Sequence, residues 1–154
     1  MTYVPGQRLS AFLRDMEKSG VWSLVTGVSD DGANWQLAGS TWEAQVVVEP
    51  RRWIGLAFEA RDPATGRKAS YDIDTDLYDI RDAYRDFAEA IEDDIIAFLG
   101  DLRDGRVLRK VGGSGFVVLV PAGDGFTRIT KGWVLTTSER SEGLRAGEEY
   151  VPIG

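Results

Sequence analysis

The segment LYDIRDAYRDFAEAIEDDIIAFL, residues 77–99, is the most strongly periodic part of the chain. At about 100° per residue, its apolar side chains fall on one arc of a helix. That arc holds Leu77, Ile80, Tyr84, Phe87, Ala88, Ile91, Ile95, Phe98 and Leu99. Asp74, Thr75 and Asp76 are suited to cap the free N–H groups at its start, and Gly100 lies just past its expected end. We expect a long amphipathic helix of about 34 Å.

The chain before this helix has the pattern of one short helix and five strands. The short amphipathic helix begins at or just before Ser10 and ends at Gly20, a residue typical of helix C-termini. Beyond it the apolar period changes to two, which is typical of strands. The predicted strands are residues 21–28, a segment around Trp35 and Leu37, residues 41–48, and a hairpin made of residues 54–60 and 69–73.

Two or three more strands are expected after the long helix, over residues 106–111, 116–120 and 126–137. The strands are joined by short turns, so they run antiparallel, because parallel pairs need long crossovers. We therefore predict an α+β fold: a predominantly antiparallel, curved sheet of about seven or eight strands, with the short N-terminal helix and the long helix packed on one face. Residues 1–137 are expected to form a single domain, and the polar residues 138–154 a loosely ordered tail.

The composition excludes several classes of functional site. The 154 residues contain no cysteine and no histidine. Disulfides, thiol nucleophiles, Ser-His arrangements, and zinc or haem sites built on these residues are therefore ruled out. With a net charge of −7, the chain also lacks the basic footprint of a nucleic-acid binder. No motif indicates an activity, and we expect no cofactor.

The N-terminal residues lack the pattern of a secretion signal. Proline and charged residues interrupt residues 2–18, whereas a signal peptide needs an unbroken apolar run. The longest apolar run, residues 116–120, is far too short to cross a membrane. We therefore expect a cytoplasmic protein without membrane association. Its 14 arginines against four lysines are typical of a GC-rich bacterial source.

The acidic charge of the chain is concentrated around the long helix. Residues 72–104 contain twelve acids and three bases, a net charge of −9, while the rest of the chain is +2. Five of the acids recur at spacings of three and four residues, which places them on one stripe opposite the apolar arc. The stripe consists of Asp79, Asp82, Asp86, Glu89 and Asp93, and it is flanked by Tyr78 and Ile96.

Helix formation alone does not favour this stripe. Like charges four residues apart, such as Asp82 and Asp86, cost a helix about 0.2–0.5 kcal/mol per pair. Acids in the last turns also oppose the helix dipole. One interpretation is a solvated surface face that nearby arginines partly balance. The other is a docking surface for a basic protein, with Tyr78 and Ile96 as apolar anchors beside it.

A second acidic group lies just before the helix. Asp72, Asp74 and Asp76 have the spacing of the first three ligands of a calcium loop. The rest of that pattern fails, because Leu77 stands where the loop needs glycine and Ala83 where it needs a bidentate glutamate. A strand that leads into a helix cap explains the same acids. A nonstandard divalent-metal site with hydrolase chemistry is the weaker alternative.

The tryptophans fall in predicted strands and are expected mainly in the core. Trp35, Trp42 and Trp53 are the candidates for lining an apolar pocket between the sheet and the long helix. Such a pocket would suit a carrier of small apolar ligands.

Three functions of different classes are thus compatible with the sequence. The favoured hypothesis is a noncatalytic binding module of the immunity protein, antitoxin or secretion-chaperone kind. Its acidic helix face would bind a basic protein partner such as a toxin or effector. The alternatives are a small apolar ligand carrier and a divalent-metal-dependent hydrolase. The sequence does not indicate an oligomeric state.

Overall fold

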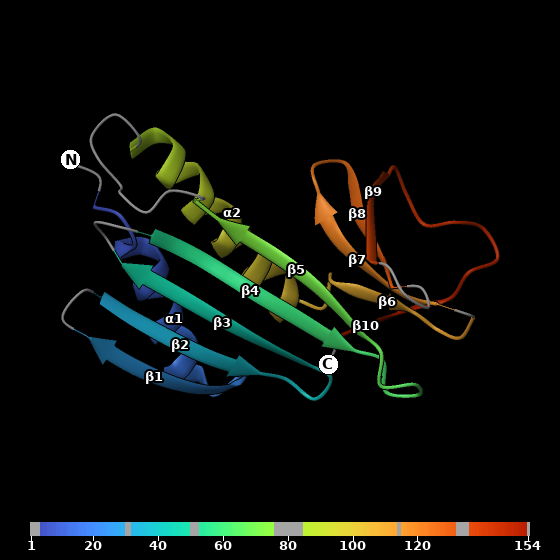
Figure 1. Cartoon of the computed structure of the whole chain (residues 1–154), viewed down its shortest axis with the longest axis horizontal. Coiled ribbons are helices and arrows are strands. Elements are labelled where there is room, and N and C mark those ends of the chain that lie inside the picture. The colour runs from blue at the N-terminus through green and yellow to red at the C-terminus, as the bar shows by residue number, and fades with distance from the viewer. Residues whose placement is uncertain are drawn as a thin grey trace. The chain divides into compact units, whose positions relative to one another are not determined.

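The structure, a computed structural model, describes residues 4–29, 32–49, 53–75, 85–113, 115–131 and 136–153. Over these residues the chain forms two helices and ten strands, and the strands make two antiparallel sheets of five strands each (Figure 1). The predicted α+β class with antiparallel pairing is confirmed. The prediction of one sheet with seven or eight strands is wrong, because the described strands after the long helix pair with one another.

The chain divides into two compact units. One unit comprises Met1–Gly39, Glu43–Phe58 and Asp72–Ala97, and the other comprises Ser40–Trp42, Glu59–Tyr71 and Phe98–Gly154. Most of the boundaries fall inside strands or inside the second helix, while the one after Gly39 lies in the loop between two strands. A single domain over residues 1–137 stays a prediction.

The first sheet has the strand order β1-β2-β3-β4-β5, so each strand lies beside its neighbour in the sequence (Figure 1). Its strands are β1 (Ser23–Ser29), β2 (Gly32–Ala38), β3 (Trp42–Glu49), β4 (Trp53–Arg61) and β5 (Lys68–Asp74). The five strands predicted before the long helix are thereby confirmed.

Alternation along these strands separates a buried face from an open face. In β3 the buried side chains are those of Trp42, Ala44, Val46 and Val48. Trp35 of β2 pairs with Val46 and is buried on the same face, 2% exposed. The residues between them, such as Gln36 and Gln45, are exposed.

Helix α1 (Gln7–Ser19) packs on the buried face of this sheet (Figure 1). Its buried side chains are Leu9, Leu13 and Met16. Gly6 precedes the first turn with a φ of 80°, and a Cβ at this position would overlap Cγ1 of Val48. Only glycine allows the chain to pass this close to β3. Gly20 ends the helix in a left-handed conformation with its N–H donating to the Met16 carbonyl, as predicted.

Helix α2 (Arg85–Arg103) is the described part of the predicted long helix. The predicted start lies in residues 76–84, outside the described residues. Gly100 does not end the helix as predicted, because the buried Leu102 extends the apolar arc. Gly105, with a φ of 74°, supplies the left-handed residue just beyond the helix instead. Phe87 also departs from the predicted buried arc, since it is 45% exposed.

The second sheet has the order β10-β6-β7-β8-β9. Its strands are β6 (Leu108–Lys110), β7 (Phe116–Ala122), β8 (Gly125–Lys131), β9 (Thr136–Ser141) and β10 (Tyr150–Pro152). The central strand β7 is buried on both faces over residues 116–120. This continuous apolar run forms the centre of the sheet's core.

The polar C-terminal segment differs from the loosely ordered tail that its composition predicts. Residues 138–153 contribute most of β9 and all of β10. Ile153 is buried, and its N–H donates to the carbonyl of Val107. The segment is therefore part of the second sheet.

Candidate binding face on helix α2

The predicted acidic stripe is only partly described by the structure. Outside the described residues lie Asp79, Asp82 and Tyr78. On α2 lie Asp86, Glu89, Asp93 and Ile96. The two aspartates on α2 are exposed, while the glutamate and the isoleucine are partly exposed.

Arg8 of α1 pairs with carboxylates of this stripe. Its guanidinium donates a hydrogen bond to Asp93, and its Nη2 lies 3.8 Å from Oε1 of Glu89 and 3.9 Å from Oε1 of Glu92. Burial lowers the pKa of Arg8, but the hydrogen bond to Asp93 and the three negative charges raise it more. Glu89 and Asp93, two of the predicted contact residues, are therefore already paired within the chain.

Glu92 is a buried carboxylate that the stripe does not include. Its side chain is 0% exposed, and its Oε2 accepts a hydrogen bond of 2.9 Å from the backbone N–H of Leu9. Leu9 is in the first turn of α1, where Gly6 has no side chain to cap the free N–H groups. Glu92 thus caps α1 from α2, where the positive end of the helix dipole favours a carboxylate.

The position of Glu92 on the helix was a usable signal. At about 100° per residue, it falls between Leu99 and Ile96, at the edge of the apolar arc. An acid beside buried apolar residues needs a partner, because burying an unpaired charge is costly. The sequence does not show which N–H group would provide that partner.

The side of α2 turned away from Arg8 carries charges that nothing described neutralises. Viewed down the axis of α2, five exposed residues cover an arc of about 100° on this side. They are Asp86, Phe87, Ala90, Asp94 and Ala97, which we name the free flank. Neither aspartate forms an ion pair or hydrogen bond with a described side chain. The free flank therefore combines two exposed carboxylates, unpaired within the described part of the chain, with an exposed phenyl ring.

The acids of the metal-site alternative are only partly described. Asp72 and Asp74 lie two residues apart on β5 and share a face of the sheet, whereas Asp76 lies outside the described residues. Burial, together with the charge of Asp74, raises the pKa of Asp72. Among the described residues, no three acids are grouped so that they would hold a metal ion.

The tryptophans of the ligand-carrier alternative occupy different environments. Trp35 and Trp42 are buried, at 2% and 5% exposure, and Trp53 is partly exposed. Trp53 alternates with the buried Ile54 on β4, and its ring lies close to where a Cβ at Gly55 would be. Trp53 therefore lies on the other face of β4 from Ile54, and a ligand pocket lined by all three tryptophans stays a prediction.

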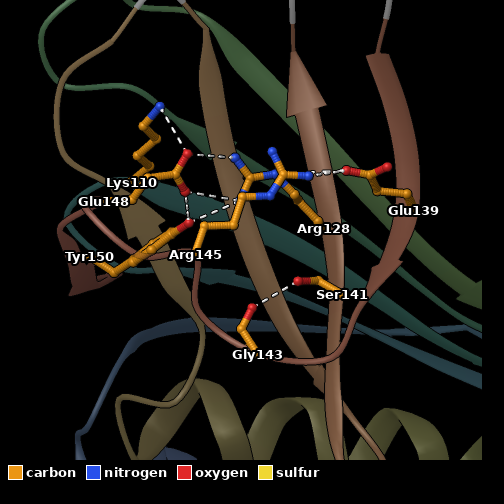
Figure 2. A network of polar contacts seen from close by, with 8 residues as sticks. All are labelled: Lys110, Arg128, Glu139, Ser141, Gly143, Arg145, Glu148 and Tyr150. Carbon is orange, nitrogen blue, oxygen red and sulfur yellow. Dashed lines mark hydrogen bonds and ion pairs between the residues drawn. The ribbon is translucent and has the colours of Figure 1, made fainter.

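A polar network in the second sheet is a further cluster that the sequence did not indicate (Figure 2). Arg128 of β8 is buried, and its Nη1 and Nη2 lie 3.3 and 3.4 Å from the two carboxylate oxygens of Glu148. Its Nη1 also donates to the Tyr150 hydroxyl at 2.9 Å, and Lys110 Nζ lies 3.4 Å from Glu148. Arg145, in the loop between β9 and β10, donates a hydrogen bond to Glu139 of β9. These contacts fix the loop between β9 and β10 to the sheet.

The network holds Glu148 in its charged form. The hydrogen bond from the Tyr150 hydroxyl, with further help from Arg128 and Lys110, lowers the pKa of Glu148 to about 2. A carboxylate held this firmly in its charged form is a poor proton acceptor near neutral pH. We assign the network a structural role.

Comparison with known proteins adds no functional assignment. No protein-family model matches the chain, and no curated protein or solved structure is significantly similar to it. Among the described residues, neither helix has the length and apolar character needed to span a membrane.

Proposed function

We propose that this protein is a noncatalytic binding module that uses an acidic face of α2 to bind a basic protein. The observation that carries the proposal is the free flank, where Asp86 and Asp94 are exposed, without an ion pair to any described side chain, beside the exposed ring of Phe87. An aromatic anchor beside complementary charges is typical of protein-binding surfaces.

The geometry shifts the proposed contact from the sequence-derived stripe. Arg8 already compensates Glu89 and Asp93, so their attraction for an outside cation is reduced. Asp86 belongs both to the stripe and to the free flank, and Asp79 and Asp82 remain candidates beyond the described residues. We therefore place the centre of the contact on the free flank.

The net charge of −9 over residues 72–104 supports this choice of partner. A concentrated charge of one sign accelerates encounter with an oppositely charged protein and selects against acidic ones. Immunity proteins, antitoxins and secretion chaperones are classes in which a small acidic protein would use such a surface. The proposed partner is accordingly a basic toxin or effector.

The test compares two double charge reversals with the same net charge. Asp86→Lys with Asp94→Lys changes the free flank, and Asp15→Lys with Glu17→Lys changes exposed positions on α1. We expect the first pair to weaken binding of a labelled oligoarginine peptide about tenfold more than the second, measured by fluorescence anisotropy at about 0.05 M salt. Phe87→Ala separates the aromatic contact from the charge.

Equal weakening by the two double variants would show that only net charge acts, and it would refute the free flank as a binding face. Far-UV circular dichroism of each variant checks that the helices persist. All substituted residues are exposed, so the expected change in stability is within about 0.5 kcal/mol per residue.

A further inference from the structure

The edge strands of the two sheets differ in how they are protected. An edge strand presents unpaired N–H and C=O groups, and charged residues, proline or a short length prevent other strands from pairing with it. Edge strand β5 carries Lys68 and Asp72, and β9 carries Glu139 and Arg140. The remaining edge strand of the second sheet, β10, has three residues and ends with Pro152. The first sheet's other edge, β1, has none of these features over seven residues.

The side chains of β1 are exposed on both faces of the sheet. Val25 is 66% exposed and Val28 is 82% exposed. Val25 pairs with Gln36 on the open face, whereas Val28 pairs with Ala33 on the face that carries the core. A strand added beside β1 would therefore cover apolar surface on both faces as well as pair the free backbone groups.

The sequence around β1 is also depleted of charge. Residues 21–42 include β1 and β2 and contain two charged residues, where the average of the chain would give about six. Both are aspartates, at positions 30 and 31, between the ends of the two strands. Depletion of charged residues is typical of the core of a protein interface. In a chain of net charge −7, an uncharged edge is also where two copies meet with the least repulsion.

We propose that β1 pairs with β1 of a second copy of this chain, antiparallel and about a two-fold axis at Thr26. In this register Leu24 lies opposite Val28 of the second copy on the core side, and the two Thr26 side chains lie opposite each other. Aliphatic pairs and Thr–Thr pairs across strands are favourable. On the open face Val25 lies opposite Gly27 of the second copy, which has no side chain to obstruct it. The sequence of β1 is thus complementary to itself, which a two-fold contact requires.

This pairing would join the two first sheets into one continuous sheet of ten strands. It uses β1 and leaves the free flank of α2 out of the contact. The dimer therefore stands independently of the proposed partner binding, and each is testable when the other fails.

The test measures the mass of the full chain in solution by sedimentation equilibrium. We expect a dimer of the wild-type chain. Thr26→Lys places two like charges opposite each other at the two-fold axis, and we expect it to raise the dimer dissociation constant at least about tenfold. Thr26→Glu should do the same. A mixture of the two variants should restore a dimer, because each lysine then lies opposite a glutamate.

Ser70→Lys is the matched control, since Ser70 is an exposed residue of the opposite edge strand β5. It should leave the mass of the wild-type dimer unchanged. A wild-type chain that is monomeric in solution overturns the proposal. So does a wild-type chain that stays monomeric and binds an extended foreign peptide instead of a second copy. A dimer that persists in Thr26→Lys, or one that the mixture does not restore, also overturns it. Circular dichroism of every variant checks that the variant is still folded, so that loss of the dimer is not caused by unfolding.

Discussion

At the residue scale, the two buried charges of the described residues each compensate a backbone or side-chain group. Glu92 is completely buried, yet it accepts the N–H of Leu9 and lies near Arg8. Arg128 is buried beside Glu148 and Tyr150. A hydrophobic pattern does not predict such residues, because each depends on a partner that is distant in the sequence.

The first prediction concerns Glu92. Replacing it by alanine leaves the Leu9 N–H without its acceptor and removes one counterion of Arg8, which is itself 46% exposed and can be hydrated. We expect a loss of about 2 kcal/mol in the free energy of unfolding, within the range for a lost cap or a buried unsatisfied group. Urea denaturation followed by circular dichroism measures it.

Two further variants serve as a comparison and a control for the Glu92→Ala measurement. Glu92→Gln keeps an oxygen acceptor for Leu9 and should lose less stability than the alanine variant. Glu17→Ala removes an exposed acid from α1 and should change stability by less than about 0.5 kcal/mol. A Glu92→Ala protein as stable as the Glu17→Ala protein would contradict the capping role.

The second prediction is a pH dependence at Glu148. Its pKa in the folded state is lowered to about 2 by the Tyr150 hydroxyl and then by Arg128, below the ordinary value of 4.5. The folded state therefore favours the carboxylate, and this stabilisation is present above pH 4.5 and is lost as the pH falls toward 2. Glu148→Gln should be less stable than wild type at neutral pH, and the difference should shrink through that window.

Urea midpoints measured across the pH range test this prediction. Glu142→Gln removes one charge from an exposed position of the same loop and serves as the control. A difference between wild type and Glu148→Gln that stays constant from neutral pH to about pH 2 would contradict the assignment.

At the scale of secondary-structure elements, the periodic segments were predictable and their partners were not. Alternation identified β1 to β5, and Gly20 marked the end of α1. The same alternation indicates which side chains face inward but not which strands pair, so it does not distinguish two sheets from one. The end of α2 was misplaced because burial of Leu102 outweighs the cost of a glycine within the helix, about 1 kcal/mol relative to alanine.

The candidate site was predictable only in part, for a related reason. The sequence placed Asp86 on an acidic face, but the pairing of Glu89 and Asp93 depends on Arg8, about eighty residues away along the chain. The free flank can be defined only when the position of α1 is known, because Arg8 of α1 pairs with the other acids of α2. Phe87 was expected in the core, because periodicity does not show where the cover of a helix ends.

The third prediction concerns the loop between β9 and β10. Its polar composition is typical of a loosely ordered tail. Arg128 holds this loop through Glu148 and Tyr150 (Figure 2). In Arg128→Met, amide hydrogen exchange over residues 142–153 should accelerate at least about tenfold, because losing one partner of a buried pair costs more than the roughly 1.4 kcal/mol that tenfold represents. Arg140→Met, at an exposed position of β9, is the matched control and should leave this exchange unchanged.

At the scale of the whole molecule, the two compact units share regular elements instead of being joined by a linker. The boundary between them falls after Phe58 within β4 and after Ala97 within α2. A break at either place would interrupt a hydrogen-bond ladder or a helix, whereas independent domains are separated by exposed, flexible linkers. Separate unfolding of one unit is therefore disfavoured.

The last prediction follows from this sharing: the chain unfolds as one cooperative system. Leu56→Ala lies in one unit and Leu119→Ala in the other, and both leucines are buried, at 2% and 0% exposure. Each substitution should cost about 2–5 kcal/mol. In native-state hydrogen exchange, either one should lower the opening free energy of the slowest amides in both β2 and β7 by the same amount, because those amides exchange through the same global opening. If each substitution instead accelerates exchange only in its own unit, the units unfold separately and the single-domain prediction fails.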